Sequence, residues 1–210
     1  MPNAKVQNMH EWRNNFINSK TPFMDNVKNI IANDLDGVIE DISRDFASGI
    51  SLHDYHVNCQ LGNHIFKLDI SSSPGGGEEG GYERTSISSS IASGTDFKFV
   101  LYPEDFLISI GKLFGLQDIV LGYPEFDHNL IVKTNNKPRL KAVLAGEGAR
   151  KILQNMSGFS FKLESIEDGH ILHLSIQRAL TDINELNQVL AMFYEVLTEV
   201  EKGAQAPASL

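Results

Sequence analysis

The sequence is poor in the residues that build cross-links and membrane spans. Its single cysteine, Cys59, excludes an internal disulfide framework and any metal centre built from several thiolates. No apolar run approaches the roughly 20 residues that cross a bilayer, and the first residues lack the apolar core of a secretory signal. We therefore expect a cytoplasmic protein without direct membrane insertion.

Positive charge is also scarce. Eighteen Lys and Arg residues stand against 27 Asp and Glu residues, and the formal net charge is −9. Such a balance disfavours binding to the phosphate backbone, so we expect no nucleic-acid partner. The 210 residues, 41% of them hydrophobic, are enough for one large domain and exclude wholesale disorder.

The first fifty residues have the apolar period of helices. Met9, Trp12 and Phe16 form one stripe, and Thr21-Pro22 is typical of a second helix start. The period then continues to Phe46, although Gly37 allows a break near Asn33–Gly37. These patterns predict an N-terminal helical segment over residues 1–48.

From residue 50 to 102 the period changes to two, which predicts strands. The alternation is clearest in Phe66–Ile70 and Phe97–Leu101, and weaker in Leu52–Cys59 and Thr85–Ile91. The connections are too short for helical crossovers, so these strands should form an antiparallel meander. Gly75–Gly80 has the spacing G-x-G-x-x-G, but two carboxylates would repel a phosphate there, and we expect a mobile loop.

The second half alternates helix and strand signals. Pro103–Phe114 predicts a helix, Leu130–Lys133 a strand, and Asn136 caps a further helix that the glycines at 146 and 148 split or kink. The final helix starts at Thr181 or Asp182, where Glu185 is placed for a capping box, and Gly203 ends it.

A hairpin over residues 159–177 is the clearest local prediction. Asp168-Gly169 suits the centre of a two-residue type I′ turn. The register then pairs Leu163 with Leu174 and Glu164 with His173, and both leucines face the core. Together these elements predict an α+β fold. We expect an antiparallel sheet of about six or seven strands with helices packed on one face, in a domain over residues 50–202 followed by a disordered tail at 203–210.

Short segments of the second half resemble a known group of proteins. They are the residues Tyr82–Thr85, Lys112–Ile119, Gly122-Tyr123-Pro124-Glu125-Phe126-Asp127 and Ile131–Lys133. Together they resemble a loose group of uncharacterised bacterial proteins in which a G-x-P-x-F-D turn precedes a strand and then a helix. Some members look like soluble portions of membrane-associated chains. The resemblance spans roughly residues 80–200 and implies no activity. Because the N-terminal helices expected here are amphipathic, we expect no membrane tether.

The polar residues of this segment allow two interpretations. Asp127 and His128 could form an acid–base pair of a hydrolase-like enzyme. The favoured interpretation is structural, with Asp127 accepting backbone N–H bonds in the turn and Phe126 anchoring it in the core. We therefore assign no catalytic residue, and the sequence leans away from an enzyme.

Other candidate sites are a basic segment and an apolar pocket. A stretch of nineteen residues contains six cations and only one acid, Glu147. The cations are Lys133, Lys137, Arg139, Lys141, Arg150 and Lys151. They could form a docking patch for an acidic partner or the solvated face of a helix. A pocket between sheet and helices would be lined by Phe97, Phe99, Phe161 and Phe193.

Metal and cofactor binding have little support. His53 and His56, like His170 and His173, lie three residues apart on expected strands, so their side chains point to opposite faces. Cys59 has no recognisable nucleophile context and is expected in the core. We expect no metal and no cofactor.

These observations favour a non-catalytic interaction or assembly module with a possible protein partner. The alternatives are a small apolar-ligand carrier and a hydrolase-like enzyme. The apolar stripes of the first and last helices exceed what one sheet face needs, so we also expect a homodimer.

Overall fold

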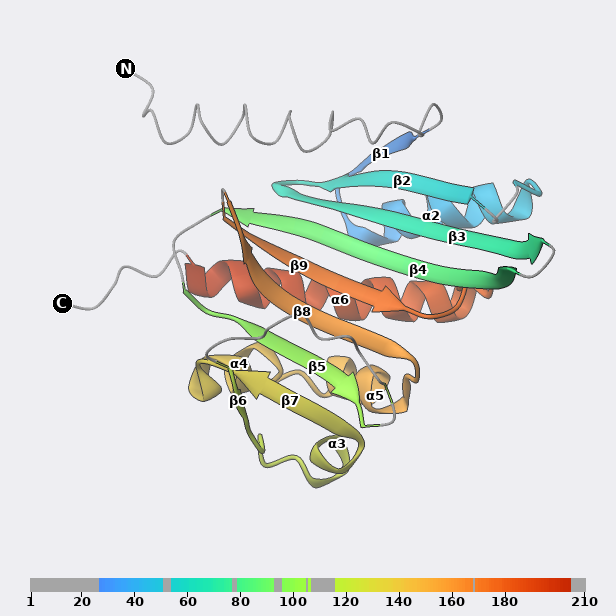
Figure 1. Cartoon of the computed structure of the whole chain (residues 1–210). Helices are drawn as coiled ribbons and strands as arrows, with labels where there is room; N and C mark the ends of the chain where they lie inside the picture. Colours follow the sequence, from blue (N-terminus) through green and yellow to red (C-terminus); the bar gives the residue numbers. More distant parts are fainter. Residues whose placement is uncertain are drawn as a thin grey trace, which may run out of the picture.

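The computed structural model describes residues 27–50, 54–76, 79–92, 96–104, 106, 116–167 and 169–204. These residues form one nine-stranded sheet in the order β1-β2-β3-β4-β9-β8-β5-β7-β6, with five helices (Figure 1). The sheet is mixed, because β1 runs parallel to β2 while the other neighbours are antiparallel. The predicted α+β class is confirmed, but the sheet has more strands than the six or seven expected and is not purely antiparallel.

The bounds of the elements follow the chain. The strands are β1 (Lys28–Ala32), β2 (Asp54–Leu61), β3 (His64–Gly76), β4 (Glu79–Ala92), β5 (Phe99–Pro103), β6 (Gln117–Asp118), β7 (Leu130–Thr134), β8 (Phe159–Ile166) and β9 (Gly169–Ile176). The helices are α2 (Leu35–Ala47), α3 (Pro124–Asn129), α4 (Lys137–Val143), α5 (Glu147–Asn155) and α6 (Ile183–Ala204).

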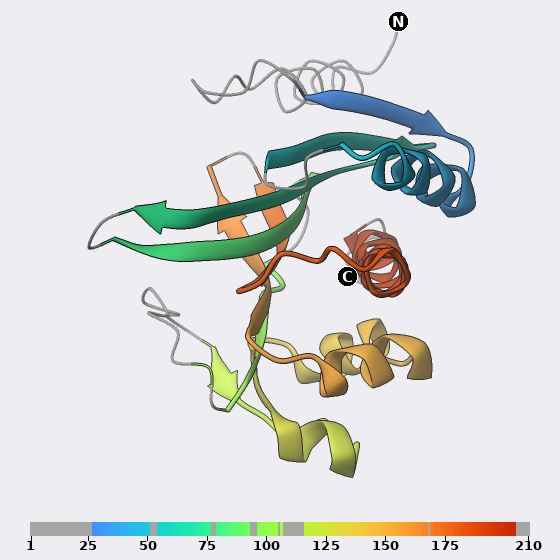
Figure 2. The same cartoon turned by 90° about the vertical axis from the view of Figure 1, so that its right-hand side faces the viewer.

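All five helices stand on one side of the sheet (Figure 2). Because side chains alternate along a strand, one set of each strand meets the helices and is buried. In β8 this set is Phe159, Phe161 and Leu163, and in β9 it is Leu172, Leu174 and Ile176. The long helix α6 lies over the middle of this face and buries, among others, Leu190, Phe193 and Leu197. We call the opposite side the outer face.

The N-terminal region corrects one prediction. Residues 28–32 form the parallel strand β1 instead of helix, and α2 begins only at Leu35, where the Asp34 carboxylate accepts a hydrogen bond from the Gly37 N–H at 2.9 Å. Five residues are too few to separate a strand from a helix by their period, and pairing with β2 decides the matter. The expected helix around Met9, Trp12 and Phe16 lies outside the described residues.

The predicted meander is confirmed for β2, β3 and β4 and wrong for β5. Strands β9 and β8 lie between β4 and β5, and β5 pairs with β8 and β7. The glycine-rich segment expected as a loop is largely strand, since β3 extends to Gly76 and β4 starts at Glu79. A Cβ at Gly81 would lie 2.7 Å from the Ser73 carbonyl oxygen, so this close strand approach requires glycine.

The hairpin has the predicted faces and a different register. Ile166 pairs with Gly169, which leaves two residues between them, and Leu163 therefore pairs with Leu172 instead of Leu174. The buried sets are unchanged, because the relative shift between the two strands is two residues. Gly169 is the first paired residue of β9 and not a turn residue, because it pairs with both Ile166 and Ala92, and its φ of 150° favours glycine.

The later helices follow their sequence signals closely. Asn136 caps α4 by accepting from the Arg139 N–H at 3.1 Å, and the helix pair breaks at Gly146 as expected. The segment predicted as a turn after Pro124 is the short helix α3. The expected helix after Pro103 lies, apart from Pro103, Glu104 and Phe106, outside the described residues.

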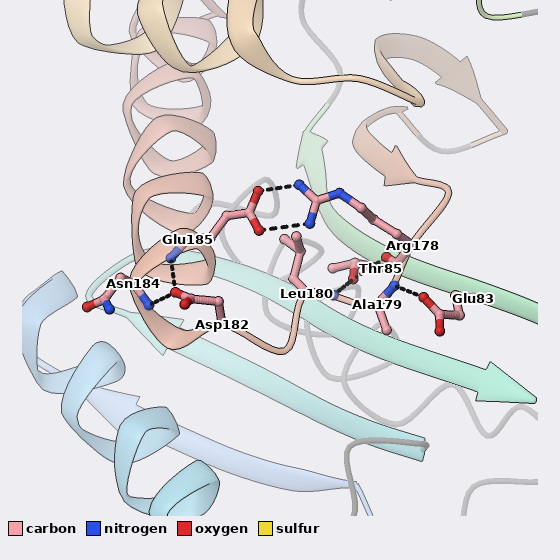
Figure 3. A network of polar contacts seen from close by, with 8 residues as sticks. All are labelled: Glu83, Thr85, Arg178, Ala179, Leu180, Asp182, Asn184 and Glu185. Atoms are coloured by element: carbon pink, nitrogen blue, oxygen red, sulfur yellow. Dashed lines mark hydrogen bonds and ion pairs between the residues drawn. The ribbon is translucent and has the colours of Figure 1, made fainter.

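A polar network fastens the start of α6 to β4 (Figure 3). The buried Thr85 hydroxyl donates to the Arg178 carbonyl and accepts from the Leu180 N–H, both at 2.9 Å. Asp182 caps α6 by accepting from the N–H groups of residues 184 and 185. The capping box is only half formed, because the Glu185 carboxylate pairs with the Arg178 guanidinium.

Candidate functional site

The segment Leu121–Asp127 is held in one conformation by a single carboxylate. Asp127 accepts hydrogen bonds from the backbone N–H groups of Leu121, Gly122 and Tyr123 at 2.7–2.8 Å. Phe126, 1% exposed, anchors the same segment in the core. Because Asp127 directs its oxygens at the backbone and His128 is exposed, the structure gives no acid–base pair at this point.

Tyr123 of this loop lies close to two cations. The Arg150 guanidinium lies 3.8 Å from the centroid of the Tyr123 ring, and the Lys141 Nζ lies 5.5 Å from it. Cations over an aromatic face are attracted by its negative potential. Arg150 is fixed further, because its Nη1 donates to the carbonyls of Leu144 and Ala145 at the end of α4. Tyr123 therefore joins α3, α4 and α5.

A pocket of about 440 Å³ opens between α3 and α5, and we call it the α3–α5 pocket. Its size falls within the ~300–1,000 Å³ range of ligand sites. The residues that line it are Tyr123, Pro124, Glu125, Phe126, Glu147, Arg150, Lys151 and Gln154. The structure thus brings the Gly122–Asp127 segment and part of the basic segment to one place, which the sequence did not predict.

The predicted basic patch divides into two groups. Lys133 pairs with Asp118 at 2.8 Å on β6, and Arg139 donates to the Val200 carbonyl and lies over the Phe97 ring. These two cations support the fold. The remaining four, which we call the α4–α5 basic surface, are Lys137, Lys141, Arg150 and Lys151.

The α4–α5 basic surface is open to a ligand. Its three lysines are exposed and Arg150 is half-buried. Within the described part of the chain, none of the four forms an ion pair. Lys137 and Lys141 lie one turn apart on the same side of α4. The carboxylates of Glu125 and Glu147 line the adjoining pocket and are also exposed.

A second polar cluster lies on the outer face of the sheet, and sequence analysis missed it. The two ring nitrogens of His56 lie 2.7 Å from Asp69 and 2.5 Å from Asp54. Burial lowers the pKa of His56, but its hydrogen bonds to Asp69 and Asp54 outweigh burial and raise it overall. Asp54 and His56 share a face because they lie two residues apart on β2, but only the pairing of β2 with β3 brings Asp69 to them, so the local sequence could not reveal the whole cluster.

A serine–histidine contact completes this outer cluster. The Ser86 hydroxyl lies 2.9 Å from His173 Nε2, and burial lowers the pKa of His173, which keeps its ring neutral. A neutral histidine could accept the serine proton. However, β4 and β9 are interior strands whose N–H groups serve the sheet ladder, so the backbone offers no oxyanion donors here.

The remaining predicted site residues lie in the core. The rings of Phe97, Phe99, Phe161 and Phe193 are at most 1% exposed, and successive rings in this order have centroids 5.6–5.9 Å apart. They pack on one another where the carrier interpretation placed a ligand. Cys59 is fully buried, and burial raises the pKa of its thiol to about 12, which disfavours a nucleophilic role.

Histidine placement agrees with strand geometry. His170 lies on the buried side of β9 at 5% exposure, while His173 lies on the outer face. In the described ranges, no three His, Cys, Asp or Glu side chains are grouped so that they could hold a metal ion. None of the described helices is long and apolar enough to span a membrane.

No family model matches the chain, and no curated protein matches it. One solved structure is similar, the crystal structure of the mycobacterial trehalose monomycolate transport factor A, TtfA. It has a TM-score of 0.38 and 8% identity, over 71% of this chain and 79% of that chain. The resemblance of Gly122–Asp127 to uncharacterised bacterial proteins stays a prediction.

Proposed function

We propose that the chain is a non-catalytic interaction module that binds an acidic segment of a partner protein on the α4–α5 basic surface. The observation that carries this proposal is that Arg150 and Lys151 line the α3–α5 pocket, with Lys141 near its Tyr123 ring and Lys137 one turn away on α4, and that none of these four cations forms an ion pair with another described residue. Residues 133–151 carry six cations and one acid, a net +5, which leaves −14 on the rest of this −9 chain. A local positive potential of this kind attracts an acidic partner despite the net charge.

The strength of such binding should depend on salt. Each exposed ion pair contributes about 1 kcal/mol or less, because water and dissolved ions screen it. Several lysines together, with the fixed Arg150, are therefore needed for measurable affinity. Binding should weaken clearly between low and physiological ionic strength.

A fluorescein-labelled decapeptide of alternating glutamate and leucine is a suitable probe, with alternating glutamine and leucine as its uncharged control. In fluorescence anisotropy at low salt, the wild-type chain should bind the glutamate peptide at least tenfold more tightly than the glutamine peptide. The triple variant Lys137→Gln/Lys141→Gln/Lys151→Gln should lose most of this binding.

A matched control removes three cations elsewhere. Arg44, Arg84 and Lys202 are exposed residues of α2, β4 and α6. The triple variant Arg44→Gln/Arg84→Gln/Lys202→Gln has the same net charge as the lysine variant and should bind like wild type. Equal losses in both variants, or no preference for glutamate, would refute the proposal.

We infer that the chain also self-associates as a homodimer. The support is the exposure of Ile31, which is 75% exposed on β1 at one end of the described sheet. Exposed apolar side chains at such a place favour contact with a second copy.

A further inference from the structure

We propose that the acidic segment inserts an apolar side chain into the α3–α5 pocket while a neighbouring carboxylate lies on Lys151 and Arg150. This inference rests on the proposed function and defines its ligand as an extended peptide in which acidic and apolar residues alternate. In an extended chain, successive side chains point to opposite sides. One side can therefore enter the pocket while the adjacent residue meets the α4–α5 basic surface.

The wall of the pocket on α3 is suited to an apolar group. Half-buried Tyr123 and exposed Pro124 offer apolar surface to a ligand, and Phe126, 1% exposed, closes the wall from the core side. Burying an apolar side chain against such a wall is favourable because it removes apolar surface from water. This contribution depends less on salt than the lysine contacts do. It also lets the pocket distinguish an acidic peptide with apolar residues from one without them, which exposed lysines alone do not.

The pocket is held open before any ligand arrives. Asp127 fixes the segment Leu121–Tyr123 by accepting hydrogen bonds from its three backbone N–H groups. Arg150 is fixed because it donates to two carbonyls of the α4–α5 connection. A site that is already ordered spares a ligand the entropy cost of ordering it. The same bonds keep the Arg150 guanidinium against the Tyr123 ring, at the pocket wall.

Two carboxylates in the wall restrict which anions fit. Glu125 and Glu147 line the same pocket as Arg150 and Lys151. Glu125 and Glu147 would repel a phosphate group or a nucleic acid strongly, because these ligands bring several negative charges close together. A single carboxylate is repelled less and can lie against Arg150 and Lys151. The mixed wall therefore favours a peptide with spaced acids over a polyanion.

Three labelled decapeptides separate this inference from the proposed function. They alternate glutamate with leucine, glutamate with serine, and glutamine with leucine. We expect the glutamate–leucine peptide to bind the full chain at least tenfold more tightly than the glutamate–serine peptide. Equal affinities of these two peptides, both above that of the glutamine–leucine peptide, would overturn the apolar insertion and leave the proposed function intact. Failure of both acidic peptides to exceed the glutamine peptide would overturn the proposed function itself.

A pair of variants locates the apolar contact. Gln154 is half-buried and lines the pocket, so Gln154→Trp should fill it. The exposed neighbour Asn155 does not line the pocket, and Asn155→Trp serves as control. We expect Gln154→Trp to remove the advantage of leucine over serine and Asn155→Trp to keep it, with unchanged far-ultraviolet circular dichroism in both. An advantage that survives Gln154→Trp would place the apolar contact elsewhere.

Discussion

At the scale of single residues, Asp127 shows how one carboxylate can define a loop. It accepts three backbone N–H groups, two of which belong to partly or fully buried residues, Leu121 and Tyr123. Asp127→Ala leaves these donors without a partner and should lower the free energy of unfolding by about 1–3 kcal/mol. Asp127→Asn keeps one acceptor oxygen and should be milder. Urea denaturation measures both, and a loss below about 0.5 kcal/mol for the alanine variant would contradict this role.

Thr85 has a comparable role at the start of α6. Its fully buried hydroxyl serves the Arg178 carbonyl and the Leu180 N–H (Figure 3). Thr85→Val keeps the shape but leaves two backbone groups unsatisfied, and should cost about 2–4 kcal/mol of unfolding free energy. Thr85→Ser retains the hydroxyl and should cost clearly less in the same urea titration. A loss for Thr85→Val no larger than that for Thr85→Ser would contradict this role of the hydroxyl.

At the scale of elements, His56 joins β2 to β3 through its contacts with Asp54 and Asp69. The pKa of His56 in the folded protein is raised above its ordinary value of 6.5, so protonated His56 stabilises the fold. By linkage, this stabilisation is fully present below about pH 6.5 and is lost as the pH rises through the raised pKa.

The variant His56→Gln isolates this contribution from the other histidines. We expect the stability difference between wild type and His56→Gln to shrink as the pH rises from 6 to 8, measured by urea denaturation at each pH. His173, whose pKa is lowered by burial, remains in both proteins and cancels in the comparison. A difference in unfolding free energy that grows from pH 6 to 8 would contradict a stabilising role of protonated His56.

Elements with strong local signals were predicted well from the sequence. Asn136 marks the start of α4, Gly146 separates α4 from α5, and alternation assigns the buried faces of β8 and β9. What failed depends on partners distant in the sequence. Strand β1 is a strand because it pairs with β2, and β5 leaves the predicted meander because β9 and β8 lie between it and β4.

The candidate site shows the same division. Phe126, Asp127 and the basic segment could be singled out from the sequence, because turn chemistry and charge clustering are local features. Their common pocket could not, since it depends on how α3 packs against α5. The separation of Lys133 and Arg139 from the other cations likewise follows from their contacts with Asp118 and the end of α6.

At the scale of the whole molecule, self-association is open to a direct test. We expect light scattering to give a mass near twice the 23.3 kDa of one chain, with dissociation on dilution. Ile31→Lys places a charge on an exposed position of β1 and should shift the equilibrium toward monomer. A mass that stays at 23.3 kDa at every concentration would end the dimer prediction.

The distribution of charge and the α3–α5 pocket predict that the peptide binds on the helix side of the molecule, at the pocket and the α4–α5 basic surface. The outer face, with Ser86 and His173, is the competing surface, and it lies across the sheet from the helices (Figure 2). Amide chemical-shift mapping of the full ¹⁵N-labelled chain with the glutamate–leucine peptide distinguishes the two surfaces. Our account predicts amide shifts that saturate with peptide at Tyr123, Glu125 and Phe126 and at residues 150–154, while those of Ser86 and His173 stay unchanged. Shifts confined to the outer face, or none that saturate, would contradict it.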